Sequence, residues 1–360
     1  MTRSNILAMR LQRQHIMASR CTTPAEVVMS LGAMQAQDYL GALWSVGLRL
    51  PGSKVESIEQ ALSAGEIVRT WPMRGTLHFV PAADARWMVK LMAPRVISSG
   101  KARDRALGLT EDTYATGLEL FREALSGGKQ LERSEMMAVL EAQGITTTEQ
   151  RGYHILWRAA QEALICLGPT HGKQQSFVLL DEWVTKHRDL SHEEALVEIA
   201  CRYFISHGPA TTKDFMRWTK LTAKDTAFAL EQLSTELAPV TVEGVEYWMS
   251  SDAEPTKMGD QAYLLPGFDE YMLGYSDRSL IVTDEQHRLI VPGKNGMFMP
   301  TIIIDGRVAG IWKRVIKRKE VIITLQPFVP LSKADLQRIA QAADRYGEYL
   351  GLPALLQAGI

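Results

Sequence analysis

The sequence has little of what marks three large classes of protein. It holds only three cysteines, Cys21, Cys166 and Cys201, and none forms a C-x-x-C pair. Neither a disulfide framework nor a zinc site is therefore expected, and a reducing cytoplasm is the expected compartment. No apolar run approaches the ~18 residues that cross a bilayer, so no membrane partner is expected. The chain also has almost no net charge, because it holds 40 Lys and Arg and 41 Asp and Glu. This balance argues against a surface that is basic all over, as in many nucleic-acid binders.

The remaining composition is that of an ordinary globular protein. Apolar residues make up 46% and charged residues 22% of the chain, which argues against disorder. A length of 360 residues suggests two to three domains. The first twenty residues hold four arginines and no acid, which does not fit a secretory signal. A transit peptide and a basic first helix packed by Ile6, Met9 and Ile16 both stay open for this segment.

One order of elements, helices followed by a hairpin, recurs three times along the chain. It is the order of a winged helix, and the periodicity of apolar residues and the turn residues predict it without any repeat of sequence. The expected elements are helices 24–34, 39–48 and 55–64 with hairpin 67–80, helices 134–143 and 146–164 with a hairpin after Gly168-Pro169, and helices 193–208, 211–221 and 222–234 with strands 238–242 and 245–249, joined through Glu243-Gly244. Thr23, with Glu26 three residues later, is the expected cap of helix 24–34, and Ser134 is that of helix 134–143.

The last hundred residues change to short apolar runs typical of strands. Asp305-Gly306 separates two of them as a hairpin turn, and a final helix is expected at 332–350 with Ser332 as its cap. The predicted fold is α+β and mostly helical, with three tandem winged-helix units, a small C-terminal β-barrel and a terminal helix. The expected boundaries are a first winged-helix unit with the catalytic motif at 1–90, a helical region and second unit at 91–190, a third unit at 191–258, and the barrel with the final helix at 259–360.

Basic residues are concentrated in two segments despite the balanced total. Segment 86–105 has six bases and one acid, and segment 307–319 has six bases and no acid. Lysine and arginine that contact phosphates release counterions from DNA, so either segment suits a DNA backbone. The alternative for each is a solvated face. If both serve DNA, they are expected to face one surface near the catalytic motif.

The segment Gln35-Ala36-Gln37-Asp38 lies between two predicted helices. On an extended segment, amides two residues apart would point the same way. Paired glutamines in such a connection are usually capping or solvent-facing groups. Because an amide does not titrate, neither glutamine can act as a conventional general base.

Five blocks of the sequence, one of which contains this motif, together indicate a known family. In chain order they are RLQRQHI (10–16), LGAMQAQDYLGALWSVGLRL (31–50), IVRTWPMRGTLHFVPAADARWM (67–88), LLPGFDEYMLGYSDR (264–278) and GMFMPTIIIDGRVAGIWKR (296–314). In this order they resemble the AlkZ/YcaQ family of bacterial winged-helix DNA glycosylases, which unhook DNA interstrand crosslinks and excise alkylated purines. The resemblance runs from about residue 5 to 350 of the sequence.

The resemblance implies a catalytic role for Gln35 and Gln37. The family motif is glutamine, an aliphatic residue, then glutamine or aspartate, and Gln35-Ala36-Gln37 matches the version associated with the crosslink-specific branch. Asp38 stands one place too late for the version that ends in aspartate. The resemblance also implies three tandem winged helices in a C shape with a C-terminal β-barrel, in agreement with the element order above.

The chemistry of such an enzyme suits neutral amides. Hydrolysis of an N-glycosidic bond passes through an oxocarbenium-like sugar, with water on the face opposite the base. An N7-alkylated purine is already cationic and leaves with little acid assistance. We therefore expect Gln37 to hold the water and Gln35 to orient the water or the sugar, with no cofactor and no metal.

Further candidates are residues that could contact DNA. The expected contacts are Arg69, Arg74, His78, Arg278, Lys313 and Arg314. The hairpin 67–80 is expected beside the motif. His78 alternates with apolar neighbours, so a partly buried structural role is equally open. Trp71 and Trp87 are expected in the core, and Asp269 and Asp277 as turn caps.

Three functions remain to be separated. The first is a monofunctional glycosylase, a monomer that acts on double-stranded DNA with alkylated or crosslinked purines. The second is a non-enzymatic winged-helix DNA-binding protein or regulator, which would normally dimerise on a palindrome. The third is an interaction scaffold with no salt-dependent affinity for DNA. Retention of both Gln35 and Gln37 favours the first.

Overall fold

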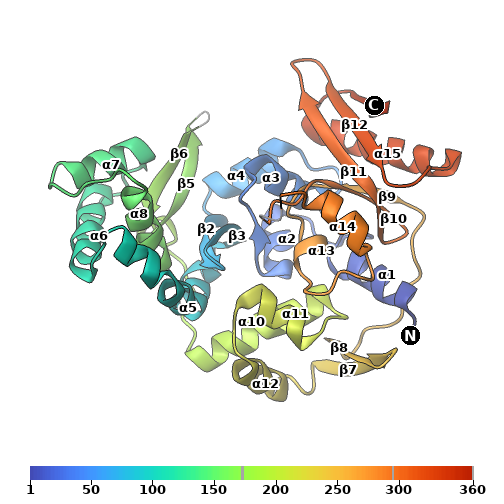
Figure 1. Cartoon of the computed structure of the whole chain (residues 1–360), viewed down its shortest axis with the longest axis horizontal. Helices are drawn as coiled ribbons and strands as arrows, with labels where there is room; N and C mark the ends of the chain where they lie inside the picture. Colours follow the sequence, from blue (N-terminus) through green and yellow to red (C-terminus); the bar gives the residue numbers. More distant parts are fainter. Residues whose placement is uncertain (172–173, 294–295, 359–360) are drawn as a thin grey trace. The chain divides into compact units, whose positions relative to one another are not determined.

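The computed structural model describes residues 1–171, 174–293 and 296–358. The chain forms two compact units, and Figure 1 labels their elements. Unit 1 joins Met1–Glu59 to Val197–Ile360, and unit 2 is Gln60–Leu196. No helix within the described ranges is long and apolar enough to cross a membrane.

Unit 1 contains both ends of the chain. Its elements, with α4 and α10 crossing its boundaries, are α1 (Arg3–Arg13), α2 (Pro24–Leu31), β1 (Met34–Gln35), α3 (Tyr39–Leu48), α4 (Val55–Ser63), α10 (His192–His207), α11 (Thr212–Thr219), α12 (Ala223–Gln232), β7 (Leu237–Val242), β8 (Val245–Ser250), β9 (Ala262–Leu265), α13 (Glu270–Leu273), α14 (Asp284–Ile290), β10 (Thr301–Ile304), β11 (Arg307–Ile316), β12 (Val321–Pro327), α15 (Lys333–Leu350) and β13 (Ala354–Ala358).

Unit 2 is continuous in sequence. Its elements are β2 (Ile67–Met73), β3 (Thr76–Pro81), the 3₁₀ turn η1 (Ala82–Asp84), α5 (Ala85–Ala106), α6 (Glu111–Leu125), β4 (Leu131–Glu132), α7 (Arg133–Glu141), α8 (Arg151–Gln161), β5 (Ile165–His171), β6 (Gln174–Leu179) and α9 (Leu180–Trp183). The expected order of helices before hairpins is present in all three rounds. The long helix α5, which carries the basic segment 86–105, and helix α6 were not assigned individually from the sequence.

Three of the hairpins turn through two residues with positive φ. The pairs are Arg74-Gly75 (φ 55° and 70°), Glu243-Gly244 (51° and 78°) and Asp305-Gly306 (50° and 76°). Two positive φ values in succession define the type I′ turn, whose twist matches that of the flanking strands. The predicted hairpin at 67–80 and the turns at Glu243-Gly244 and Asp305-Gly306 are confirmed.

Helix caps follow the predicted chemistry at α2 and α15. Thr23 accepts the N–H of Glu26 while the Glu26 carboxylate accepts the N–H of Thr23, which completes a capping box. The predicted cap at Ser134 is wrong. Helix α7 begins at Arg133, because Glu132 is the last extended residue and the Glu135 carboxylate accepts its N–H at 2.7 Å.

Ser332 caps α15 as predicted. Its hydroxyl accepts the N–H of Asp335 at 3.1 Å and donates to the Asp335 carboxylate at 2.7 Å, which lowers the pKa of Asp335 to about 2 together with Arg338. We expect Ser332→Ala to lower the free energy of unfolding by about 1 kcal/mol. Chemical denaturation measures this, and Ser332→Thr, which keeps the hydroxyl that accepts the Asp335 N–H and donates to its carboxylate, is the control. Equal losses in both variants would contradict the cap.

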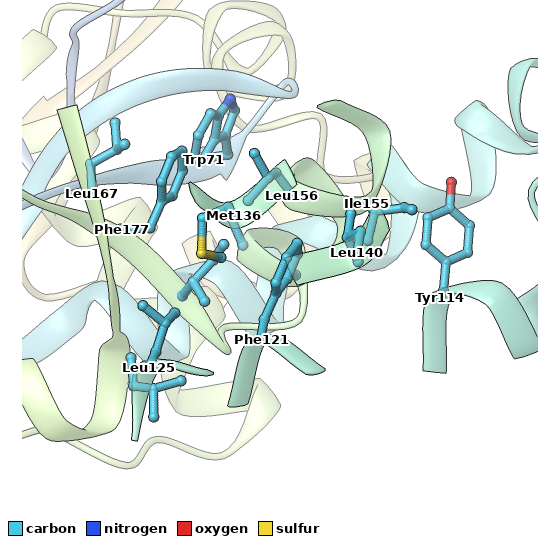
Figure 2. Packing of buried hydrophobic residues seen from close by; sticks show 14 of the residues in the cluster. Trp71, Tyr114, Phe121, Leu125, Met136, Leu140, Ile155, Leu156, Leu167 and Phe177 are labelled. Carbon is cyan, nitrogen blue, oxygen red and sulfur yellow. The ribbon is translucent and has the colours of Figure 1, made fainter. Parts of the chain in front are cut away.

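The core of unit 2 lies between its sheet and helices α6, α7 and α8. Strands run in the order β3-β2-β5-β6-β4, and each neighbouring pair is antiparallel. Figure 2 shows Phe121, Met136 and Leu140 packed beside Ile155. Trp71 and Trp87 are 6% and 3% exposed, so their predicted place in the core is confirmed.

The C-terminal sheet of unit 1 has the order β13-β12-β11-β10-β9 (Figure 1). The sequence predicted a barrel, and in the described residues the sheet is open instead, with β13 and β9 at its edges. The reason is that α15 returns the chain so that the unpredicted strand β13 pairs in parallel with β12. Strand β13 thereby occupies the edge of β12 that would have to pair with β9 to close a barrel.

Candidate active site

The segment that carries the two glutamines changes from buried to exposed within one residue. Helix α2 ends at Gly32, whose φ of 77° turns the chain inward. Gln35 is then 8% exposed and Ala36 is fully buried, whereas Gln37 is exposed. The prediction that both amides point the same way assumed an extended segment. Here β1 ends at Gln35 and the chain turns to begin α3 at Tyr39, and the common direction stays a prediction.

The side chain of Gln35 folds back onto the motif. Its Oε1 accepts the backbone N–H of Gln37 at 3.1 Å. This bond fixes the backbone that presents Gln37, while the Gln37 side chain reaches the surface. A carboxamide that reaches the surface from a fixed backbone has the chemistry to hold a water molecule or a sugar.

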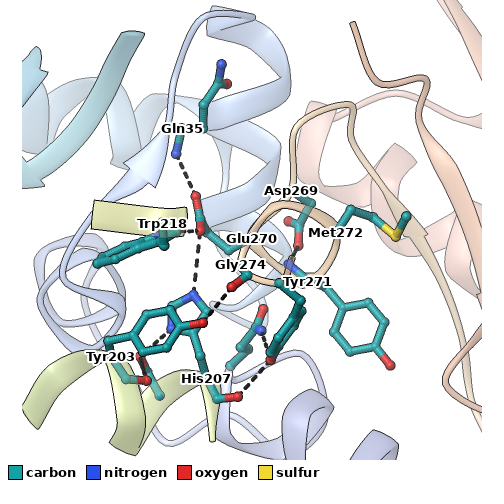
Figure 3. A network of polar contacts seen from close by, with 12 residues as sticks. Gln35, Tyr203, His207, Trp218, Asp269, Glu270, Tyr271, Met272 and Gly274 are labelled. Atoms are coloured by element: carbon teal, nitrogen blue, oxygen red, sulfur yellow. Dashed lines mark hydrogen bonds and ion pairs between the residues drawn. The ribbon is translucent and has the colours of Figure 1, made fainter. Parts of the chain in front are cut away.

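Beneath Gln35 lies a buried polar network, shown in Figure 3. The Glu270 carboxylate accepts the backbone N–H of Gln35 at 3.1 Å and the indole N–H of Trp218 at 2.9 Å. His207 Nε2 lies 3.5 Å from the same carboxylate. Tyr203 stacks on the His207 ring with centroids 4.6 Å apart. The motif is therefore attached through its backbone to α10, α11 and α13.

Helix α3, which follows the motif, is held by a second carboxylate. The guanidinium of Arg49 makes two 2.8 Å bonds to Asp269, and both side chains are fully buried. Ser45 donates to Asp269 at 2.6 Å. The indole of Trp44 donates to the carbonyl of Leu264 in β9 at 2.7 Å. These bonds fix the helix that begins two residues after Gln37.

Arg314 is the predicted DNA contact that unit 1 brings to the motif. Its guanidinium lies 3.8 Å from the carboxylate of Asp38, the residue after Gln37. It also lies 6.0 Å from the ring centre of Trp312 and 5.9 Å from that of Tyr346. Burial raises the pKa of Tyr346 to about 12, so this phenol is neutral beside the cation at physiological pH. Lys313, the preceding residue, is exposed.

The predicted contacts on the hairpin of unit 2 are mostly covered. Arg69 is 6% exposed and His78 is fully buried. His78 bonds through Nδ1 to the carbonyl of Thr76 at 2.8 Å and through Nε2 to the guanidinium of Arg74 at 3.0 Å. Arg74 occupies the turn and is half-buried. This geometry favours the structural alternative for His78 and leaves Arg74 as the most exposed of the three predicted contacts on the hairpin.

Arg278 is half-buried and bonded within its own segment. Its Nε donates to the carbonyl of Met272 at 2.5 Å, and its guanidinium lies 5.1 Å from the ring centre of Phe298. The predicted turn caps are confirmed. Asp269 accepts the N–H of Tyr271 at 2.9 Å, and Asp277 accepts that of Ser279 at 2.8 Å.

Sequence reasoning missed Glu270, Trp218 and His207. The only signal in the sequence is the position of Glu270 inside the block GFDEYMLGYSDR, which predicted roles for Asp269, Asp277 and Arg278 but not for Glu270. Among residues 1–171, 174–293 and 296–358, no three His, Cys, Asp or Glu side chains come together as a metal-binding group.

This arrangement can be compared with known proteins. Residues 28–349 match the family model described as DNA glycosylase AlkZ-like. The chain therefore belongs to the AlkZ-like DNA glycosylase family, and its enzyme class is DNA glycosylase. The resemblance noted in the sequence blocks is confirmed.

Two relatives show how far the similarity extends. An interstrand DNA cross-link repair glycosylase from Streptomyces sahachiroi is 27% identical over 370 residues, which cover 97% of this chain and 97% of the relative. The solved structure of the Streptomyces sahachiroi DNA glycosylase AlkZ matches with a TM-score of 0.83 and 24% identity, over 99% of this chain and all of that one. The structural match supports the mixed helix and sheet fold.

Proposed function

We propose that this protein is a monofunctional DNA glycosylase that hydrolyses the N-glycosidic bond of N7-alkylated purines and unhooks DNA interstrand crosslinks. The observation that carries the proposal is the exposed Gln37 carboxamide on a backbone fixed by Gln35. The name of the Streptomyces relative, a cross-link repair glycosylase, supports the choice of substrate.

In the proposed reaction, Gln37 holds the attacking water. The bond between C1′ and the purine nitrogen breaks, and its electrons neutralise the purine cation, so no general acid is required. The amide oxygen accepts a hydrogen bond from the water, and its dipole stabilises positive charge on the sugar. The water oxygen bonds to C1′, and its excess proton is then released to solvent. Gln35 acts from beneath by orienting Gln37, because its own oxygen is bonded to the Gln37 N–H.

The proposed partner is double-stranded DNA, bound by a monomer in the cytoplasm. Three tandem winged helices with the boundaries expected from the sequence are part of this proposal. Of the predicted set, backbone contacts are assigned to Arg74, Arg278, Lys313 and Arg314, because Arg69 and His78 are buried. Of these, Lys313 is exposed and Arg314 lies beside Asp38, so these two residues suit a phosphate close to the motif.

The test is incubation with duplex DNA that carries either N7-methylguanine or a nitrogen-mustard crosslink. Alkaline cleavage then reveals abasic sites, and release of the unhooked strand is read on a denaturing gel. Breakage at the modified purine is expected with purified protein. If neither lesion gives breakage, the substrate assignment is wrong.

We expect Lys313→Ala to weaken DNA binding uniformly across sequences. Loss of one phosphate contact should reduce the slope of log affinity against log salt by about 0.9. Fluorescence anisotropy from low to moderate salt measures the slope. Lys257→Ala removes an exposed lysine from the segment before β9 and is the matched control. If the two variants share one slope, Lys313 does not contact phosphate.

A further inference from the structure

The Glu270 carboxylate is placed where a charge is costly. Glu270 is 1% exposed, and a buried carboxylate is tolerated only when it is hydrogen-bonded and paired. Each of its two oxygens accepts a hydrogen bond from a different residue. Oε1 accepts the Gln35 N–H, and Oε2 accepts the indole N–H of Trp218, as Figure 3 shows.

His207 is the titratable side chain that lies beside this carboxylate. Ser206 has one hydroxyl hydrogen, and it is donated to the carbonyl of Arg202 at 2.6 Å. The 2.8 Å contact between the Ser206 oxygen and His207 Nδ1 then takes its hydrogen from Nδ1. His207 Nε2 faces a Glu270 oxygen at 3.5 Å and has no hydrogen-bond partner of its own among the described residues. The N–H groups of Gln35 and Trp218 therefore hold the carboxylate, and the His207 ring packs beside it.

We propose that Glu270 is the positioning residue of the catalytic motif: it holds the backbone of Gln35, and through the Gln35 side chain it fixes Gln37. This inference rests on the proposed function. The path consists of two bonds, Gln35 N–H to Glu270 at 3.1 Å and Gln37 N–H to Gln35 Oε1 at 3.1 Å. It connects a buried carboxylate to an exposed amide.

Other groups cannot take over this role. An amide at position 270 has one oxygen for two N–H donors, those of Gln35 and Trp218. One donor would then face an NH₂ group and lose its hydrogen bond. A shift of the motif by about 1 Å is enough to cost roughly 100-fold in rate.

The first test is Glu270→Gln, assayed under single-turnover conditions on N7-methylguanine duplex. We expect the excision rate to fall about 100-fold while the Kd for the same duplex stays within about twofold of wild type. Asp214→Asn is the matched control. Asp214 is also a buried carboxylate, and it accepts the N–H groups of Thr211 and Ser276 without touching the motif. Equal rates in the two variants would overturn the proposal.

The second test needs no activity and begins with wild-type protein. Residue-resolved hydrogen exchange should show the Gln35 amide protected, with protection reduced at least about tenfold in Glu270→Gln but kept in Asp214→Asn. An unprotected Gln35 amide in wild type overturns the proposal even if Glu270→Gln does not fold. If the wild-type protein excises neither lesion but its Gln35 amide is protected from exchange, the proposed function is wrong. The role of Glu270 in holding the Gln35 backbone is then still supported.

Discussion

Replacing Gln37 by alanine is expected to slow base excision by about 100- to 1,000-fold, the usual cost of removing one preorganised polar group from a reacting centre. The Gln37 side chain is exposed, so the free energy of unfolding should change by no more than about 0.5 kcal/mol. Affinity for duplex DNA should also be retained. Single-turnover excision, denaturation and fluorescence anisotropy together measure the three effects.

The matched control is Gln341→Ala, which removes another exposed glutamine of unit 1, on α15. It should leave excision at the wild-type rate. A Gln37→Ala variant as fast as this control would move the chemistry to other residues. Parallel losses of rate and affinity would instead make Gln37 a binding residue.

A Gln35→Ala variant distinguishes the role of Gln35 from that of Gln37. This variant loses the oxygen that accepts the Gln37 N–H but leaves the Gln37 carboxamide in place. We expect a slower excision rate than wild type but a faster one than Gln37→Ala. The reverse order in the same single-turnover assay would exchange the two proposed roles.

The parts of the fold that the sequence predicted well depend on neighbouring residues. A type I′ turn is specified by the two residues that take positive φ, such as Asp305-Gly306. A capping box is specified by residues three apart, such as Thr23 and Glu26. Such signals need no knowledge of the rest of the chain, and the structure contains both.

The parts that the sequence did not predict depend on distant pairs. Glu270 binds the Gln35 backbone across 235 positions of sequence, and no local pattern marks a carboxylate for that contact. The open C-terminal sheet is a similar case, because β13 pairs with β12 only after the whole of α15 has intervened. Gln35 and Gln37 were found through the family resemblance, since spacing alone also fits an ordinary connection between helices.

Asp269→Ala is expected to produce the largest loss of stability, about 3–5 kcal/mol of unfolding free energy, because it leaves the charge of Arg49 buried without its partner. Both side chains of this pair are fully buried, and two 2.8 Å bonds join them. Because Arg49 ends α3, this loss should loosen the helix that fixes Gln37. Chemical denaturation measures the change.

Two further variants distinguish the effect of the buried Arg49 charge on stability from the effect of apolar packing at the same place. Ser45→Ala removes the hydrogen bond to the same carboxylate and the one that its oxygen accepts from Arg49, and it should cost about 2 kcal/mol. The double variant Arg49→Met with Asp269→Leu removes both charges, so it should recover most of the stability that Asp269→Ala loses. If Asp269→Ala costs no more than Ser45→Ala, the Arg49 charge must find another partner. If the double variant is the least stable of the three, the ion pair itself stabilises the fold beyond what apolar packing can replace.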